Sequence, residues 1–347
     1  RREGMKDGDR ILVTNYERLH YFNPSDFVGV VCDESSILKN YAGATRQEIT
    51  DFMEPLPYRL LCTATAAPND YMELGTSSEA LGIMRRPEML GMFFTHDGGE
   101  TSKWRVKGHA ERRFWEWVCL WARAMRRPSD LGFDDSGFSL PPLQTREHVV
   151  ESRTATPGAL FSMVAMDLDE QREELRRTMP ERCEMAAQLV ASHNGPSISW
   201  CHLNEEGRML RQMIPGAVEV SGSDTEERKE SVFEDFSKGN IQNIVTKPKI
   251  AGFGMNWQHC AHQTFFPSHS YEQYYQCVRR SWRYGQTNPV TVDIISTDGQ
   301  QAVLSNLKRK AESCSAMFDS IVSLMREDSM AIKETRNNKK VEVPSWL

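Results

Sequence analysis

The apolar run Val28-Gly29-Val30-Val31-Cys32 is followed directly by the polar residues Asp33-Glu34-Ser35-Ser36. A short, continuous apolar run of this kind predicts a strand that is buried on both faces, as in a parallel sheet. Open α/β sheets bind their ligands at the carboxyl ends of their strands. The carboxylates of Asp33 and Glu34 are therefore expected at a ligand-binding edge, although an Asp-Glu pair can also simply cap the helix that follows.

The same alternation of short apolar runs and polar helical patterns continues on both sides of this stretch. Residues 11–14 and 58–62 have the same apolar character in the first part of the chain. After about residue 151, strand-like runs return at residues 197–201, 217–220, 241–246, 263–266 and 290–295. This rhythm predicts an α/β protein with parallel sheets.

Residues 83–150 interrupt the rhythm with a cluster of arginines and tryptophans. Within this insert, residues 110–127 predict a helix with Phe114, Val118 and Trp121 on one face. The tryptophans either form the packing core of the insert or, together with the arginines, offer a surface to the backbone of a duplex nucleic acid.

Composition limits the class of protein. The chain has 347 residues, of which 39% are hydrophobic and 26% charged, which is enough for two domains with full cores. It has no run of roughly 18 apolar residues, the length that a membrane helix needs, and no signal peptide at its start. Its eight cysteines include no C-x-x-C pair, so we expect reduced thiols in a cytoplasmic protein. The net charge of −6 argues weakly against a nucleic-acid partner, but a local basic surface is enough for one.

The most specific motif is the stretch at residues 276–286, Gln-Cys-Val-Arg-Arg-Ser-Trp-Arg-Tyr-Gly-Gln. On a helix, Gln276, Arg280 and Arg283 share one face, and Gly285 is expected to end that helix. Two guanidiniums on one rigid face match the charge of a triphosphate. The alternatives are a solvated basic helix and a contact with a nucleic-acid backbone.

Two further motifs place small residues where a backbone can approach a ligand. Thr63-Ala64-Thr65 follows the apolar run at 58–62, and Gly252 and Gly254 lie in the glycine-rich turn of residues 249–256. Glycines of this kind allow close approach to a phosphate or a nucleic-acid strand. Each motif by itself is also typical of an ordinary turn.

Taken in order, these motifs resemble those of the Swi/Snf-like branch of superfamily-two helicases and translocases, in particular phage and bacterial members. The resemblance covers most of the chain, and its order and spacing are more specific than any single motif. It rests on residues 11–17, 33–40 and 61–69, on Ser221-Gly222-Ser223 with Glu227-Arg228, on the glycine turn up to Asn256, and on Arg280 and Arg283. The sequence departs from the family at Ser35-Ser36, where Ala-His is usual, and at Ala251, Arg279 and Trp282.

The resemblance implies two RecA-like lobes with parallel sheets, the first of them incomplete, and a helical Trp/Arg-rich insert. The implied boundaries are 1–82 for the first lobe, 83–150 for the insert, 151–330 for the second lobe and 331–347 for a tail. It also implies roles for the motif residues. Asp33 binds Mg²⁺ through water, Glu34 activates the attacking water, and Arg280 and Arg283 stabilise the charge that develops. Gln276, Gly252 and Gly254 bind the nucleotide with Asp33, and Thr63, Thr65, Asn256, Ser221 and Gly222 couple the nucleotide to a nucleic acid.

The implied function is that of an ATP-dependent DNA translocase or helicase, with ATP and Mg²⁺ as cofactors. It acts on duplex or single-stranded DNA without sequence preference, in the cytoplasm of a prokaryote or of a phage-infected host, together with accessory replication or repair proteins. The family's Gly-x-x-x-x-Gly-Lys-Ser/Thr phosphate-binding loop occurs nowhere in these residues. We therefore expect that residue 1 is not the natural start and that the chain alone has little or no activity.

Three alternatives stay open at this point. The first is a non-catalytic module, derived from a helicase, that binds DNA or a protein. The second is a metal-dependent nuclease or other hydrolase that uses Asp33 and Glu34, for which no further metal ligand is obvious nearby. The third is a zinc site at His259-Cys260-x-His262, which lacks a second ligand pair.

Overall fold

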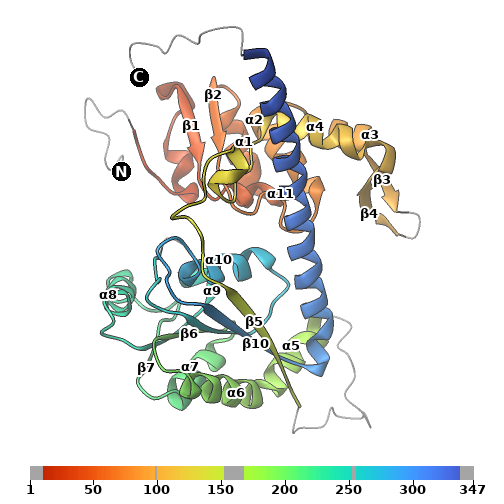
Figure 1. Cartoon of the computed structure of the whole chain (residues 1–347). Helices are drawn as coiled ribbons and strands as arrows, with labels where there is room; N and C mark the ends of the chain where they lie inside the picture. The colour runs from red at the N-terminus through yellow and green to blue at the C-terminus, as the bar shows by residue number, and fades with distance from the viewer. Residues whose placement is uncertain (1–10, 98–99, 152–167, 252–254, 337–347) are drawn as a thin grey trace. The chain divides into compact units, whose positions relative to one another are not determined.

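The computed structural model describes residues 11–97, 100–151, 168–251 and 255–336 (Figure 1). These residues form two compact units. The first unit consists of the described residues before Asp135 and after Ala311, and the second unit consists of those from Asp135 to Ala311.

The first unit contains a two-stranded parallel sheet. Strand β1 (Gly29–Cys32) pairs with β2 (Tyr58–Leu61), with Cys32 opposite Leu61. One face of this sheet packs against helix α1 (Ala44–Met53), helix α2 (Leu74–Leu81) and the 3-10 helices η1 (Tyr16–Tyr21) and η3 (Ser35–Lys39). The core of this packing consists of Leu19, Cys32, Leu38, Ile49, Met53 and Ala80.

The prediction of strands buried on both faces was wrong for all three runs in this unit. Residues 11–14 are not a strand, and Val13 is 89% exposed. The outer face of the β1–β2 sheet is also uncovered, since Val31 is 65% exposed and Leu60 53%. Both errors have one cause: apolar runs indicate a strand that is buried on both faces only where neighbouring strands and helices cover it, and within the described residues this sheet has two strands and one covered face.

The remainder of the first unit is the Trp/Arg-rich insert and the end of the last helix. The insert was expected to be helical. It contains helix α3 (Arg86–Phe93), an antiparallel hairpin of β3 (Phe94–Asp97) and β4 (Glu100–Val106), and helix α4 (Glu111–Trp121). The hairpin was not predicted. The long helix α11 (Gln301–Arg336) contacts α4 through the Sγ atom of Cys119, which donates to the carbonyl oxygen of Ile321.

The aromatic residues of the insert form its packing core. Phe114 and Trp115 on α4 are buried, and the Trp115 ring meets that of Tyr71 edge-on at 4.9 Å. Several arginines of the insert are engaged in ion pairs within the unit, as between Arg126 and Asp319 at 2.5 Å. Of the two interpretations of the tryptophans, Trp115 fits the first, because it is part of the packing core of the insert.

The second unit is built on a six-stranded sheet whose neighbouring strands are all parallel, in the order β5-β10-β9-β6-β8-β7. Its strands are β5 (Leu143–Val150), β6 (Ser197–Trp200), β7 (Ala217–Glu219), β8 (Asn243–Thr246), β9 (His262–Phe265) and β10 (Val290–Thr297). The predicted α/β class is confirmed, and this sheet flanked by helices is the arrangement expected of a RecA-like lobe.

Helices cover both faces of the six-stranded sheet (Figure 1). Helices α6 (Met179–Ser192) and α7 (Asn204–Met213) pack on one face around Cys183, Val190 and Leu210. Helices α8 (Glu226–Ser237), α9 (Pro248–Ala251) and α10 (Tyr271–Ser281) pack on the other, around Phe236 and Cys277. Helix α5 (Leu168–Arg177) precedes α6.

The chain passes from one unit to the other between Asp134 and Asp135 and between Ala311 and Glu312, and the expected lobe boundaries at residues 82, 150 and 330 stay predictions. Strand β5 pairs with β10 along its whole length, so the second unit begins before residue 150. The insert up to Asp134 belongs to the first unit, as does α11 from Glu312 onward. Among the described residues, no helix combines the length and the apolar character that a membrane crossing requires.

Candidate functional site

The carboxyl end of the β1–β2 sheet brings two of the predicted motifs together. Cys62 donates from its backbone N–H to the carbonyl oxygen of Cys32 at 2.8 Å, and Ser35 donates to the carbonyl oxygen of Cys62 at 3.0 Å. The backbone hydrogen bonds between the two segments thus continue beyond the ends of both strands. Because of it, the Asp33–Glu34 pair and the turn that begins at Thr63 leave the same edge of the sheet, side by side.

Glu34 has an unusual backbone conformation. It is the one non-glycine residue with positive φ among those that the structure describes, with φ 49° and ψ 45°. A left-handed conformation costs a side-chain-bearing residue about 1–3 kcal/mol and is typical of functional sites. Its N–H donates to Oδ1 of Asp33 at 3.0 Å, and the hydroxyl of Tyr16 donates to the carbonyl oxygen of Asp33. These contacts fix the turn with Asp33 exposed and Glu34 half-buried.

The neighbouring turn holds a buried hydroxyl. The backbone N–H of Thr65 donates to Oγ1 of Thr63 at 3.0 Å. Thr65 itself is 0% exposed, and its Oγ1 has no hydrogen-bond partner among the described residues. Buried polar atoms nearly always have a partner, so this hydroxyl is a candidate to bind a ligand or water at the sheet edge.

On the second unit, the two arginines of the most specific motif converge on one atom. Arg280 donates from Nη1 to the carbonyl oxygen of Met255 at 3.2 Å, and Arg283 does the same at 3.4 Å. Arg280 also donates from Nε to the carbonyl oxygen of Gln276 at 3.2 Å. Gln276 and Arg280 are buried and Arg283 is half-buried.

One detail of the predicted helix was wrong, because Gly285 does not end it. Helix α10 ends at Ser281, and Arg283 lies beyond its last turn. The reason is local: Trp282 leaves the helical conformation, and its indole Nε1 donates to the carbonyl oxygen of Pro141 at 2.7 Å. The guanidinium of Arg279 lies over the rings of Tyr275 and Trp282.

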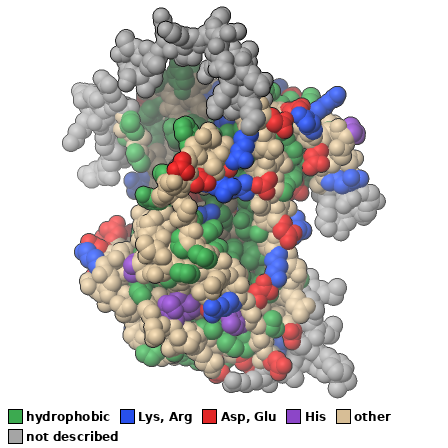
Figure 2. Space-filling model, in the orientation of Figure 1, with side chains coloured by type: hydrophobic (Ala, Val, Ile, Leu, Met, Phe, Trp, Pro, Cys, Tyr) green, Lys and Arg blue, Asp and Glu red, His purple; other side chains and the backbone are tan. Residues whose placement is uncertain are grey.

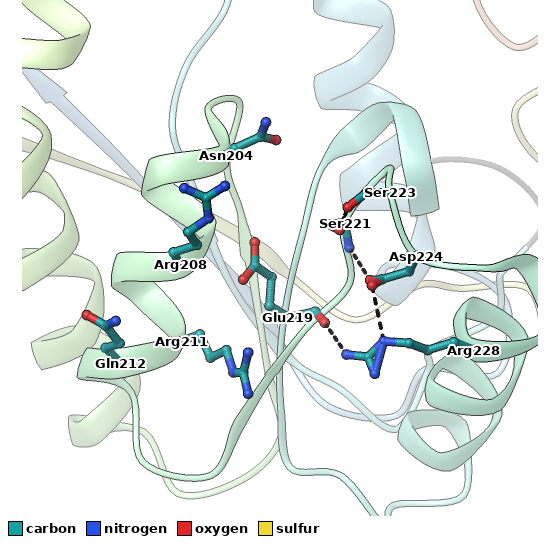
Figure 3. A pocket seen from close by; sticks show the side chains of 9 residues that line it. All are labelled: Asn204, Arg208, Arg211, Gln212, Glu219, Ser221, Ser223, Asp224 and Arg228. Atoms are coloured by element: carbon teal, nitrogen blue, oxygen red, sulfur yellow. Dashed lines mark hydrogen bonds and ion pairs between the residues drawn. The ribbon is translucent and has the colours of Figure 1, made fainter.

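The structure places the other predicted residues of the second unit as follows. Gly252 and Gly254 lie outside the described residues. Asn256 is exposed directly after Met255. Ser221 follows β7, and its backbone N–H donates to Oδ2 of Asp224 at 2.8 Å (Figure 3). The hydroxyl of Ser221 lies 2.9 Å from that of Ser223, and Gly222, between these two serines, is exposed.

The contacts of Cys260 and His262 do not support the zinc site considered at His259-Cys260-x-His262. Burial raises the pKa of the Cys260 thiol to about 12, and its Sγ donates to the carbonyl oxygens of Pro196 and His262. His262 is held by Ser197 and Asp293. In the part of the chain that the structure describes, no three His, Cys, Asp or Glu side chains are grouped to hold a metal ion.

Sequence reasoning missed one cavity. A pocket of about 590 Å³ lies between α7, the end of β7 and the start of α8, and Arg208, Arg211 and Glu219 line it (Figure 3). These residues come from elements that become neighbours only in the fold. The available signal was Gly207, a glycine in the middle of a helical pattern, which often has a packing or functional reason.

Charge on the surface is mixed. On the face of the molecule that Figure 2 shows, basic and acidic side chains are interspersed and do not gather into one basic surface. Two places where the structure brings arginines together are the Arg280–Arg283 pair and the pocket beside α7.

No family model matches the chain, and no curated protein matches it. Among solved structures, the chain is similar to the crystal structure of the C-terminal part of the Fun30 ATPase domain, with a TM-score of 0.34 and 14% sequence identity. That match covers 47% of this chain and 57% of that one, so the chain spans less than two thirds of its length.

Proposed function

We propose that this chain carries part of an ATP-driven DNA translocase or helicase, with nucleotide-binding residues on both units. The observation that carries the proposal is the convergence of Arg280 and Arg283 on the carbonyl oxygen of Met255. Two guanidiniums held at one point are suited to bind phosphate oxygens and to stabilise negative charge during phosphoryl transfer. A solvated basic helix has no need to hold its arginines together in this way.

The first unit supplies the acidic residues of the proposed reaction. Asp33 has an exposed carboxylate at the edge of a parallel sheet, which fits Mg²⁺ because this ion prefers carboxylate oxygen and retains several of its waters. When bound with ATP, Mg²⁺ neutralises phosphate charge. Glu34, held next to Asp33 by its left-handed turn, orients the attacking water and accepts its proton.

The proposed contact with DNA uses backbone atoms and small side chains. Thr63 and Thr65 follow β2 at the same edge as Asp33. Ser221 and Gly222 follow β7, and Asn256 lies between α9 and β9. Such residues fit phosphodiester oxygens without reading sequence. The buried hydroxyl of Thr65 is the candidate to relay the state of the nucleotide.

The 347 residues contain no Gly-x-x-x-x-Gly-Lys-Ser/Thr loop, so we expect them to bind ATP weakly and to turn it over little by themselves. The coding DNA upstream of Arg1 tests this first. An in-frame phosphate-binding loop after an apolar strand would support a complete motor. A start codon near Arg1 would favour the non-catalytic binding module.

The proposal is tested by the DNA-stimulated ATPase activity of the protein expressed from its entire reading frame. Glu34→Gln is expected to abolish hydrolysis and to spare ATP binding, and Arg280→Ala to lower turnover by at least about a hundredfold, as removal of a charge-stabilising group usually does. Glu54→Gln, an exposed carboxylate of the same unit, is the matched control and is expected to leave activity unchanged. Hydrolysis that persists in Glu34→Gln would contradict the role of Glu34.

A further inference from the structure

The pocket at the end of β7 is lined by polar and charged residues. Its volume of about 590 Å³ lies within the range of small-ligand sites, about 300–1,000 Å³. It is lined by Asn204, Arg208, Arg211, Gln212, Glu219, Ser221, Ser223, Asp224 and Arg228 (Figure 3). None of these side chains is apolar or aromatic, so the pocket suits a charged, strongly hydrogen-bonding ligand and excludes an apolar one.

The positive charge of the pocket comes mainly from helix α7. Arg208 and Arg211 lie one turn apart on this helix, and both are exposed to the cavity. The guanidinium of Arg208 lies 3.9 Å from the carboxylate of Glu205, at the long end of the range for an ion pair. In contrast, Arg228 is fixed in the wall, 3.2 Å from Asp224 and 3.3 Å from the carbonyl oxygen of Glu219. The two helix guanidiniums are therefore available to bind an oxyanion such as a phosphoryl group.

The negative charge of the pocket faces the same two guanidiniums. Burial raises the pKa of Glu219, and the charges of Arg211 and Arg208 oppose that rise. The carboxylate rests against the backbone of α7 at Gly207, where an added Cβ would lie only 2.5 Å from Oε1 of Glu219. The glycine thus creates the space in which this carboxylate lies beside the arginines.

This charge pattern narrows the ligand class. Arg208 and Arg211 attract a simple anion, but Glu219 repels it. A protonated amine is attracted by Glu219 and repelled by the two arginines. A ligand satisfies all three side chains when it combines a phosphoryl group with neutral hydrogen-bond donors. Two adjacent hydroxyls match the two oxygens of one carboxylate, which only accepts hydrogen bonds when ionised.

We propose that this pocket binds a sugar phosphate with vicinal hydroxyls. Arg208 and Arg211 bind the phosphoryl group, and the sugar hydroxyls donate to the carboxylate of Glu219. The site lies within the second unit and uses neither Arg280 nor Arg283. It shares Ser221 with the proposed DNA contacts, but the three side chains that bind the ligand, Arg208, Arg211 and Glu219, have no role in the proposed motor function.

Isothermal titration calorimetry on the whole chain tests the proposal with three probes: ribose 5-phosphate, 2-deoxyribose 5-phosphate and inorganic phosphate. Ribose 5-phosphate is expected to bind most tightly. Arg208→Ala and Arg211→Ala should weaken all three probes by at least about tenfold, the usual effect of losing a charge-assisted hydrogen bond. Glu219→Gln should weaken ribose 5-phosphate by a similar factor and leave inorganic phosphate as tight or tighter. Arg176→Ala, an exposed arginine on α5, is the matched control.

Gly207→Ala separates binding from folding. Alanine in a helix interior ordinarily raises stability, and the atom that must move is the end of the flexible Glu219 side chain. The melting temperature is therefore expected to hold or rise, while the affinity for ribose 5-phosphate falls about tenfold. Absence of saturable ribose 5-phosphate binding to the unaltered chain would overturn the proposal. So would equal affinity for the deoxy sugar together with indifference to Glu219→Gln. Arg280→Ala should not change these titrations, which distinguishes this site from the proposed ATPase.

Discussion

The guanidinium of Arg182 lies 2.8 Å from the carboxylate of Glu206, and both side chains are 0% exposed. This ion pair joins α6 to α7 beneath the six-stranded sheet, and the Arg182 guanidinium also lies over the ring of Phe266 at 4.7 Å. The other carboxylate oxygen of Glu206 accepts hydrogen bonds from the backbone N–H groups of His202 and Leu203, at 2.8 and 2.9 Å. Glu206 therefore neutralises a buried charge and caps the start of α7 at once.

Removing one partner of this pair leaves a buried, uncompensated charge. We expect Glu206→Gln to destabilise the second unit by about 3–5 kcal/mol. The exposed pair Arg208–Glu205 on the same helix, at 3.9 Å, provides the control, because Glu205→Gln should change stability by less than about 1 kcal/mol. Hydrogen exchange of the amides in α6 and α7 measures both effects within this unit. Equal protection in the two variants would contradict the role given to Glu206.

Acidification is expected to destabilise the second unit. Burial lowers the pKa of His193, His202, His259 and His269 from their usual value of 6.5. The unfolded chain therefore binds more protons than the folded one below about pH 6.5, and stability falls as the pH falls through that value. Glu219, whose pKa burial raises, contributes in the opposite direction.

Thermal unfolding between pH 7.5 and pH 5.5 measures this dependence. The melting temperature should fall over that window, and the slope should be smaller in His202→Gln, because one buried titrating group is then absent. A slope of the same size in the variant, or a melting temperature that does not change with pH, would rule out these histidines as its cause.

Much of the second unit could be predicted from its sequence, whereas less of the first could. The runs at residues 197–201 and 290–295 are strands because helices cover both faces of their sheet, so that apolar character and burial agree. The run at 11–14 has equal apolar character and is exposed, since a strand also needs a neighbour to pair with. The apolar pattern of a segment indicates which secondary structure that segment can form. It contains no information on the strands and helices that surround the segment in the fold.

The candidate site shows the same limit at the level of single residues. Arg280 and Arg283 were predicted together from their spacing, and they do meet, but through the carbonyl oxygen of Met255 and with Arg283 beyond the helix. The left-handed turn at Glu34 had no signature in the sequence, and neither had the hydroxyl of Thr65, which has no partner among the residues that the structure describes. Both depend on the packing of the adjacent turns at the sheet edge.

Thr65→Val tests whether the hydroxyl of Thr65 serves function or folding. Valine has nearly the same shape and removes a buried polar atom that has no partner among the described residues, so stability should hold or rise by about 1 kcal/mol. Thr76→Val is the matched control. Thr76 is equally buried, but its Oγ1 donates to the carbonyl oxygen of Glu73 at 2.7 Å, so that variant should lose about 1 kcal/mol. If Thr65→Val lowers stability as much as Thr76→Val does, the hydroxyl has a structural partner and is not a ligand-binding group. If the proposed function holds, Thr65→Val should in addition lower DNA-stimulated ATPase activity.

The left-handed conformation of Glu34 makes a last prediction, in which two variants differ in stability but not in activity. Glycine adopts this conformation without a steric penalty, whereas alanine retains the Cβ clash, which costs about 1–2 kcal/mol. We therefore expect Glu34→Gly to be more stable than Glu34→Ala by about 1 kcal/mol, after allowance for the greater freedom of glycine in the unfolded chain. Chemical denaturation of the first unit, followed by hydrogen exchange around β1, gives the comparison. Both variants lack the carboxylate and should be equally inactive in the ATPase assay. Equal stability of the two would show that the turn relaxes when the glutamate is lost, and that the left-handed backbone at this position depends on the contacts of the carboxylate itself.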